Sequence, residues 1–428
     1  MQKIRMTTSA LALGALAFPL LAACGGDGGG AAGSNDAFKQ HLDDRGPITY
    51  VQGKVNDNAT KGIIAKWNKL HPEEKVTLKE QTDEADQQHD DLVRNLDAKN
   101  PDYDVVSVDL VWTAEFAAKG YLQPLEGDLA VETDGLLESA VKGGQYNGVQ
   151  YASPTTSDGG MLYYRTDLVK TPPKTWSELF EMCDVADKAG IDCYAGQFNK
   201  YEGLTVNASE AINGAGGSIV DEDGKTPTVD SPEAAEGLQV LVDGFKNGDI
   251  PKSAITYTEE EGREAFQSGK LLFLRNWPYV HGLAAKEASS KVKGKFDVAP
   301  LPGLDGVGAS TLGGHNTAIS AYSDHKATAI DFVNFLASEE IQHEYLDLGS
   351  LAPIRSDVYE DADLVKKYPY LPTLLTSIEN AVPRPITPFY PAVTKAIQDN
   401  AYAALKGEKS AEEAVADMAA AIEAASGK

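Results

Sequence analysis

The sequence predicts an α/β protein with two domains and a mainly parallel sheet in its first region. Short apolar strands alternate there with stretches of helical periodicity, which is the pattern of βαβ units. About 390 residues remain after an N-terminal leader and tether, too many for one ordinary core. The hydrophobic fraction of 42% and the charged fraction of 24% are those of a globular protein.

The first region, residues 47–120, is expected to alternate strands with helices. We expect strands at 47–51, 75–79 and 104–109, and helices at 59–70, about 87–98 and 113–119. In open α/β sheets, ligands bind beyond the carboxyl ends of the strands. The loop at 53–58 and Asp109, the last residue of the third strand, meet that rule. Asp109 could instead serve as a turn residue or a helix N-cap.

The middle of the chain contains a hairpin and then a break in the pattern. An Asn-Gly pair at 147–148 favours a tight hairpin turn. Residues 157–160 interrupt the pattern before a new strand at 161–165, which indicates a crossing into the second domain. Thr175 and Glu178 have the spacing of a capping box. Further helices are expected at about 205–213, 231–247 and 258–268.

The last part of the chain delivers aromatic residues beyond a short apolar strand. That strand, 270–276, ends directly before Trp277 and Tyr279. Residues 296–303 are extended and broken by prolines, which suits a crossing back to the first domain. Later features are a glycine turn at 313–314 before another strand, a helix at about 326–337, a proline-rich loop at 383–390 and an amphipathic helix near 410–425.

The N-terminus is typical of an exported protein. A short basic head with Lys3 and Arg5 precedes an apolar run at 10–21, which is too short to span a bilayer. The following Leu-Ala-Ala-Cys, ending at Cys24, is similar to the bacterial lipobox, in which the cysteine becomes the lipidated first residue. An ordinary signal peptide with a chance cysteine is the alternative. We therefore expect a signal peptide at 1–23, a lipidated Cys and flexible tether at 24–45, and a body held at the outer face of the cell membrane.

Charge and cysteine content exclude several classes of partner. With 38 Lys and Arg against 64 Asp and Glu, the net charge is −26, which argues against nucleic acid and against wide contact with anionic lipid. Cys183 and Cys193 are ten residues apart in a chain predicted to leave the cytosol, so a local disulfide is expected. A metal site is the alternative, but no His or further Cys lies near them with ligand spacing. We expect neither metal nor cofactor.

Several strings together resemble the extracytoplasmic sugar-binding proteins of ATP-binding-cassette (ABC) importers, closest to the trehalose/maltose-binding lipoproteins. These strings are DVVSVDLVWTAEF (104–116), GGMLYYRTDL (159–168), PKTWSEL (173–179), NWPY (276–279), LGG (312–314) and PRPITP (383–388). The resemblance implies a two-lobed flytrap whose lobes exchange segments and close about a hinge around a sugar. It places lobe one at 46–156 plus 301–350 and lobe two at 157–300 plus 351–428. It further implies a monomer that serves membrane permease subunits.

The resemblance also implies a ligand site. The matching positions are two carboxylates, two aromatic residues, a glycine whose backbone lies against the ligand, and an arginine of the last loop: Asp109, Asp158, Trp277, Tyr279, Gly314 and Arg384. His315 stands where the family often has Trp, and Thr156 stands where it has another aromatic residue. Asn56 is carried from the first loop. The departures at His315 and Thr156 leave the identity of the sugar open.

These residue types suit a neutral polyol. Carboxylates accept strong hydrogen bonds from hydroxyl groups, Arg supplies a planar fork of donors, and aromatic rings cover the C–H faces of a sugar. Each residue also has an ordinary explanation, because Trp277 and Tyr279 could be core residues and His315 could be a surface residue. An anionic ligand fits poorly beside the two aspartates, whereas a cation remains compatible with them.

We expect a binding protein without catalysis. A secreted glycosidase needs two carboxyl groups at a fixed separation, and Asp109 and Asp158 would come from different lobes, which is poor preorganisation. The sequence contains no nucleophile elbow, phosphate loop or dinucleotide fingerprint. A polyamine or cation binder of the same fold is the stronger alternative. The expected ligand is an α-glucoside such as trehalose, maltose or a short maltodextrin.

Overall fold

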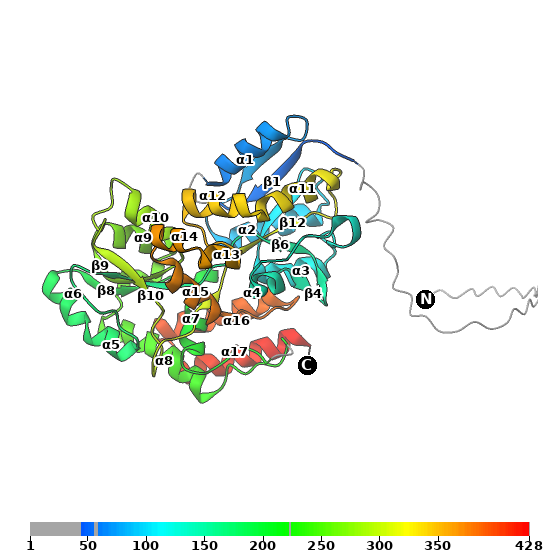
Figure 1. Ribbon diagram of the computed structural model, residues 1–428. Coiled ribbons are helices and arrows are strands. Elements are labelled where there is room, and N and C mark those ends of the chain that lie inside the picture. Colours follow the sequence, from blue (N-terminus) through cyan, green and yellow to red (C-terminus); the bar gives the residue numbers. More distant parts are fainter. Residues whose placement is uncertain (1–43, 55–58, 222–223, 428) are drawn as a thin grey trace, which may run out of the picture. The chain divides into compact units, whose positions relative to one another are not determined.

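The computed structural model describes residues 44–54, 59–221 and 224–427. Two larger sheets organise these residues (Figure 1). The first is five-stranded, with the order β2-β1-β3-β12-β6. Its strands are β1 (Ile48–Gln52), β2 (Val76–Glu80), β3 (Val105–Asp109), β6 (Ala152–Pro154) and β12 (His315–Ile319). This sheet and its helices form the first lobe.

The three strands of the first region are parallel, as expected, but the complete first sheet is only half parallel. β1 runs parallel to β2 and β3, as βαβ units require. β12 pairs antiparallel with both β3 and β6. The reason is that β12 enters this sheet from the other lobe, after the chain has crossed and returned. Local patterning predicted the strands, but the direction of a returning strand depends on that crossing.

The helices of the first lobe come from both ends of its sequence. They are α1 (Ala59–Leu70), α2 (Ala85–Asp97), α3 (Thr113–Ala118), α4 (Glu138–Gly143), α11 (Lys326–Ala337) and α12 (Glu339–Gly349). The late helix α12 packs against the early helix α1 (Figure 1). The buried rings of Tyr50 on β1, Trp67 on α1 and Phe332 on α11 meet edge to face. A segment after residue 310 thus completes a core begun before residue 120.

The second sheet has four strands in the order β10-β7-β9-β8. Its strands are β7 (Met161–Arg165), β8 (Asp192–Ala195), β9 (Leu271–Asn276) and β10 (Phe296–Ala299). β10 pairs antiparallel with β7 along its whole length. The segment predicted to cross back is therefore an edge strand of this sheet, and its prolines lie beyond the paired residues.

Helices surround the second sheet and form the second lobe with it. They are α5 (Trp176–Glu181), α6 (Cys183–Ala189), α7 (Glu202–Asn213), α8 (Pro232–Asn247), α9 (Glu259–Gln267), α10 (Tyr279–Lys286), α13 (Ser356–Glu360), α14 (Ala362–Lys367), α15 (Leu371–Glu379), α16 (Tyr390–Leu405) and α17 (Ala411–Ser426). The capping box predicted at Thr175 and Glu178 is confirmed. A second capping box, formed by Ser410 and Glu413, begins the alanine-rich α17, which packs against α16 and α8 (Figure 1).

Two of the segments that cross between the lobes lie side by side, next to a short strand of the second lobe. Backbone hydrogen bonds join Asp158 and Gly313 in both directions, with N···O distances of 3.1 and 2.8 Å. Next to them, β11 (Thr311–Leu312) runs parallel to β13 (Val382–Pro383). The crossing segments are where a hinge motion has to bend the chain. The limits of the lobes, at 46–156 with 301–350 and 157–300 with 351–428, stay a prediction.

The remaining expectations concern single features. The Asn147-Gly148 hairpin forms, with positive φ at both turn residues as its turn type requires. Cys183 and Cys193 are buried and their Sγ atoms lie 2.03 Å apart, a bonding distance. The signal peptide at 1–23 and Cys24 lie outside the described residues. None of the helices in the described part of the chain is long and apolar enough to cross a membrane.

We predict that the Cys183–Cys193 pair is a stabilising disulfide. Because the bond closes a short loop, its removal in a Cys183→Ser, Cys193→Ser variant should lower the free energy of unfolding by about 2–3 kcal/mol. Chemical denaturation of both proteins measures this difference. Dithiothreitol should destabilise the wild type to the same extent and leave the variant unchanged. A wild type that unfolds identically with and without reductant would contradict the bond.

Candidate functional site

The predicted residues Asp109 and Arg384 meet in an ion pair between the segments that carry them. Asp109 ends β3 of the first lobe, and Arg384 follows β13, between α15 and α16 of the second lobe. Arg384 Nη2 donates to Asp109 Oδ1 at 2.8 Å. The same carboxylate oxygen also accepts from the backbone N–H of Val111 at 3.3 Å, so Asp109 caps the short helix that follows it. Asp109 therefore both caps this helix and pairs with Arg384.

Glu202 is a third member of this group, and no sequence motif indicates it. Arg384 Nη1 donates to Glu202 Oε1 at 2.6 Å. Tyr390 Oη donates to the same oxygen, and Thr394 Oγ1 donates to Oε2 at 2.6 Å. Burial raises the pKa of Glu202, while the charge of Arg384 opposes that rise. Its partners come from distant helices, so no local motif could have identified it.

Arg384 is consequently held between two carboxylates. Its side chain is almost completely buried, and the charges of Asp109 and Glu202 keep it protonated with a pKa well above the usual value despite that burial. Its Nε finds no hydrogen-bond partner among the described residues. A buried, unsatisfied N–H costs free energy unless a further acceptor reaches it. The guanidinium of Arg384 is thus fixed in position and charged, and its Nε–H is available to a further acceptor.

Asp158 differs from Asp109 in its surroundings. It lies in the first crossing segment, and its side chain is half-buried. Burial, and then the nearby charge of Asp109, raise the pKa of Asp158 to about 7, with Arg275 acting in the opposite direction. At neutral pH this carboxyl group therefore exists in both protonation states. The two aspartates of the predicted site can then play different parts, one fixed in an ion pair and one able to donate or accept a proton.

His315 and Thr156, the two departures from the family, are neighbours. His315 pairs with Asp109 across β12 and β3, so both side chains project from the same face of the sheet. Thr156 Oγ1 accepts a hydrogen bond from the backbone N–H of His315 at 3.1 Å. The His315 side chain is exposed, yet desolvation lowers its pKa.

The local structure explains why residue 314, directly before His315, is a glycine. Gly314 has φ +110°, and a Cβ there would lie 2.2 Å from the carbonyl oxygen of Thr156. Other residues are excluded by both the backbone conformation and the contact. Its proposed approach to a ligand therefore stays a prediction. Asn56, expected from the first loop, lies outside the described residues.

The two predicted aromatic residues are engaged differently. Trp277 follows β9 directly and is half-buried, with the guanidinium of Arg275 stacked on its ring at 3.9 Å from the centroid. Tyr279 lies at the start of α10, and its hydroxyl donates to Glu260 Oε1 at 2.7 Å. The Tyr279 hydroxyl is thereby committed within the second lobe. Of the pair, Trp277 is the better candidate for a surface against a ligand.

A second polar contact connects the lobes beside the ion pair. Asp86, in the first turn of α2, accepts the backbone N–H of Glu202 at 3.2 Å through Oδ1. Its Oδ2 accepts from Gln398 Nε2 at 3.3 Å. Burial and the charge of Glu202 raise the pKa of Asp86 to about 7. Asp86 therefore links α2 of the first lobe to α7 and α16 of the second.

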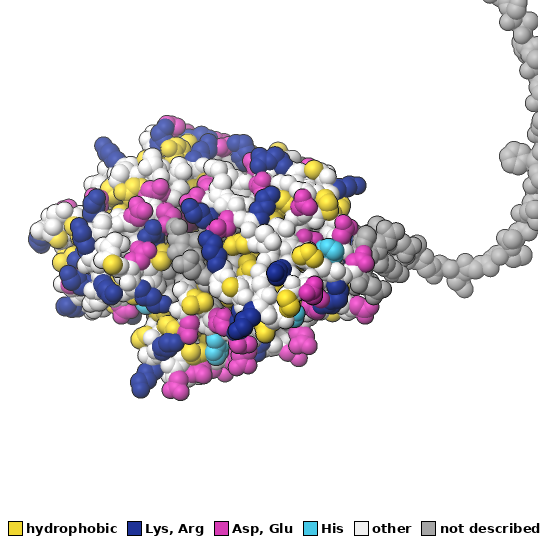
Figure 2. Space-filling model, turned by 90° about the horizontal axis from the view of Figure 1, so that it is seen from above, with side chains coloured by type: hydrophobic (Ala, Val, Ile, Leu, Met, Phe, Trp, Pro, Cys, Tyr) yellow, Lys and Arg dark blue, Asp and Glu magenta, His cyan; other side chains and the backbone are white. Residues whose placement is uncertain are grey.

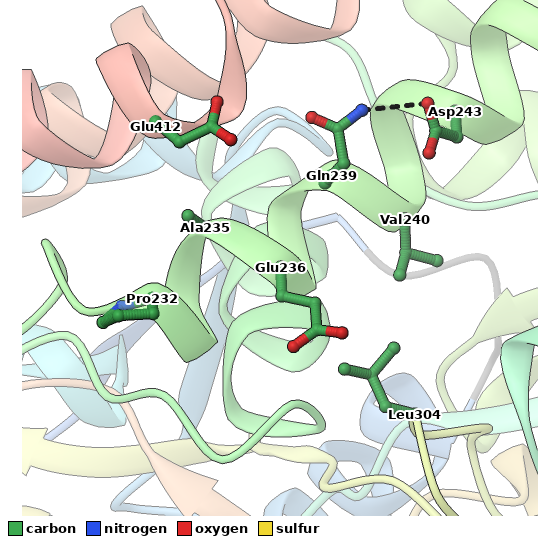
Figure 3. Close-up of a pocket in the computed structure, with 8 residues that line it drawn as sticks. All are labelled: Pro232, Ala235, Glu236, Gln239, Val240, Asp243, Leu304 and Glu412. Carbon is green, nitrogen blue, oxygen red and sulfur yellow. Dashed lines mark hydrogen bonds between the residues drawn. The ribbon is translucent and has the colours of Figure 1, made fainter.

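A separate hollow of about 510 Å³ lies on the outer side of α8. It is lined by Pro232, Ala235, Glu236, Gln239, Val240, Asp243, Leu304 and Glu412, and the Gln239 amide is tied to Asp243 (Figure 3). None of the predicted site residues lines it, so we assign the site to the cluster between the lobes. The described residues also hold no group of acidic, His or Cys side chains suited to a metal ion.

The molecular surface carries charges of both signs. Acidic and basic side chains are interspersed over the face seen in Figure 2. The basic residues on this face do not merge into the continuous stripe that a nucleic-acid backbone requires. The polar chemistry most suited to a small ligand is thus that of the cluster, where Asp109, Asp158, Trp277 and Arg384 converge on the crossing segments.

Known proteins resemble this chain in both sequence and structure. A probable ABC transporter-binding protein of Deinococcus radiodurans is 37% identical over 308 residues, which are 69% of this chain and 72% of that protein. The maltotriose-binding protein of Pyrococcus abyssi is 27% identical over 317 residues, 70% of this chain and 65% of that protein.

The structural likeness extends over nearly the whole described chain. The structure of maltose-bound MalE3 from T. maritima shares 33% identity with this chain, with a TM-score of 0.83 over 88% of this chain and 99% of the other. This confirms the predicted two-lobed flytrap fold. The sequence profile of the family described as "Bacterial extracellular solute-binding protein" matches residues 52–343. The chain therefore belongs to the bacterial extracellular solute-binding protein family.

Proposed function

We propose that this protein captures an α-linked gluco-oligosaccharide and delivers it to the permease of an ABC importer. The ligand would be trehalose, maltose or a short maltodextrin. The observation that carries the proposal is the cluster of Asp109, Asp158, Trp277 and Arg384 at the crossing segments. Support for a glucoside comes from the relative named for maltotriose and from the similar structure that holds maltose.

The cluster offers what a sugar needs and little that other ligands need. Asp158 and the remaining lone pairs of Asp109 accept hydroxyl groups, and the spare donor of Arg384 can reach a hydroxyl oxygen. The indole ring of Trp277 supplies an apolar surface for a C–H face. Tyr279, Gly314, His315 and Asn56 complete the proposed site. His315 would add a ring nitrogen at the position where relatives often have Trp.

The rest of the proposal concerns where the protein acts. An exported chain, lipidated at Cys24 and tethered through 24–45, would keep a monomeric body at the outer face of the membrane. Closure of the lobes around the sugar would present the closed form to the permease, and a separate ATPase would supply the energy. No catalysis is proposed, in keeping with a family described by solute binding.

A polyamine binder of the same fold is the second candidate. Four carboxyl groups near the crossing segments, those of Asp86, Asp109, Asp158 and Glu202, favour a cation. Arg384 between two of them weighs against it, because its fixed positive charge would repel a cationic ligand. A glycosidase is a weaker third candidate, since Asp109 is already held by Arg384. Ionic strength separates the first two, because only cation binding should weaken strongly with salt.

Titration calorimetry of the body from residue 46 tests this function. We expect binding at micromolar or tighter dissociation constants to one of trehalose, maltose or maltotriose, and no binding of cellobiose or spermidine. Replacing Trp277 by Ala should weaken that binding by about ten-fold or more, because the stacking surface is lost. Binding of spermidine alone would favour a polyamine-binding protein. Release of glucose from the bound sugar would show that the protein is a hydrolase.

Glu202→Gln tests the role of the residue that sequence inspection missed. The variant has one carbonyl oxygen where Tyr390 and Thr394 donate to two different carboxylate oxygens, and it loses the charge that holds Arg384. We expect sugar affinity to fall by about ten-fold, the size of one charge-assisted hydrogen bond. Glu236→Gln, at an exposed position on α8, is the matched control and should bind like the wild type. Equal affinity of the two variants would remove Glu202 from the site.

The protonation of Asp158 should make sugar binding depend on pH. Because its pKa is raised to about 7, the unliganded protein holds this proton below that pH. Hydroxyl groups that donate to Asp158 favour the ionised form, so binding releases the proton and affinity should rise with pH until it levels off above about 7. We expect the ratio of wild-type to Asp158→Asn association constants to grow by about ten-fold between about pH 5.5 and 7.5.

Calorimetry at a series of pH values measures that ratio. The raised pKa of Asp86 is common to both proteins and therefore cancels in the ratio. A flat ratio would show that Asp158 does not change its protonation when sugar binds. A falling ratio would show that the protonated carboxyl group donates to the ligand instead.

A further inference from the structure

The indole ring of Trp277 is held from several sides. The guanidinium of Arg275 covers one face, 3.9 Å from the ring centroid. The side chain of Trp277 also interacts with the half-buried Glu259. The far edge of the ring, at Cζ3 and Cη2, points at the backbone of Gly313 in the returning crossing segment. Such contacts leave the opposite face as the surface that remains for a ligand.

Arg275 is a rigid support for the ring. Its side chain is 1% exposed. Nε and Nη2 donate to Glu210 at 2.7 and 2.5 Å, and Nη1 donates to Gln197 at 3.0 Å. Glu210 also accepts the backbone N–H of Thr311 at 3.1 Å, which joins this support to a crossing strand. Because these hydrogen bonds fix the guanidinium of Arg275 in one orientation, the indole of Trp277 cannot move toward Arg275.

Gly313 limits the ring on the other side. A Cβ at this position would lie 2.7 Å from Trp277 Cζ3 and 2.8 Å from Cη2, closer than real Cβ contacts come. The backbone of Gly313 is fixed by its two hydrogen bonds to Asp158. Unlike Gly314, it has no left-handed φ, so alanine suits the backbone. The added Cβ would meet the indole first and would also come within 3.3 Å of Asp158 Cβ. Any side chain here has to displace the ring.

We propose that Gly313 is a positioning residue that sets where the Trp277 ring lies and thereby selects a ligand with a flat apolar face. The ligand part of this proposal rests on the proposed sugar-binding function. A ring fixed before binding loses little entropy when it stacks on a pyranose. An open-chain polyol gains less, since it has to freeze its own torsions against the same surface. The absent side chain at residue 313 is thus a specificity determinant.

Gly313→Ala tests the proposal without any ligand. The protein has four Trp residues, so ¹H–¹⁵N spectra show four indole N–H signals, and the loss of one signal in Trp277→Phe assigns it. We expect Gly313→Ala to shift the Trp277 signal and leave the other signals in place. Gly306→Ala is the matched control, because a Cβ there meets no atom within 4 Å and its φ is also ordinary. An unmoved Trp277 signal in Gly313→Ala overturns the proposal.

Binding measurements show whether Gly313 acts through the ring. We expect Gly313→Ala to weaken binding of the best sugar by about ten-fold, and Gly306→Ala to leave it unchanged. Phe lacks the outer ring that carries Cζ3 and Cη2, so Gly313→Ala added to Trp277→Phe should cause no further loss. Additive losses in this cycle would overturn the proposed route through Trp277.

The outcomes remain separable. If Gly313→Ala fails to fold, the double variant with Trp277→Phe should fold, since the clash is gone, and failure of both variants overturns the proposal. If the wild type binds no sugar, the proposed function is rejected, whereas the indole signal still decides whether Gly313 positions the ring. Thermal melting of each variant reports the first case, and calorimetry of the wild type reports the second.

Discussion

The buried ion pairs of Arg384 are the interaction on which the rest of the site depends. A guanidinium removed from water is tolerated only where carboxylates compensate it at close range. Those carboxylates lie on β3 of one lobe and on α7 of the other, so satisfying one charge fixes the mutual position of three segments. The crossing strands, the cleft residues and the aromatic ring are then arranged around that constraint. Separating the lobes requires water to replace one carboxylate, which makes closure a balance between solvation and pairing.

Elements defined by local chemistry were predictable from the sequence. The helix at 326–337 and the Thr175 capping box follow from periodicity and cap residues, which act over a few positions. The direction of β12 and the role of the 296–299 segment were not predictable in this way. Both depend on where the chain crosses between lobes, and that is settled by pairing partners far away in sequence. Hydrophobic patterning predicts that a segment is a strand, whereas the strand it pairs with determines whether it runs parallel or antiparallel.

The site shows the same division between local and distant information. Asp109, Trp277 and Arg384 could be named from the sequence because each lies in a string that resembles a family motif, and Asp158 directly precedes another such string. Glu202 lies in no such string, and its role arises only when α7, α16 and the last loop meet. The difference between the two aspartates is likewise invisible in sequence, because burial and the neighbouring charge produce it.

The contact between Asp86 and the backbone of Glu202 has a consequence for α7 itself. The N-cap residue of this helix, Tyr201, provides no side-chain bond to the first turn. A carboxylate from the opposite lobe takes that place, so the helix is capped in trans. When the lobes part, the cap is withdrawn and the first turn is free to fray. Fraying of the first turn of α7 is then coupled to the separation of the lobes. Backbone amide exchange at Glu202 would therefore report how often the lobes separate.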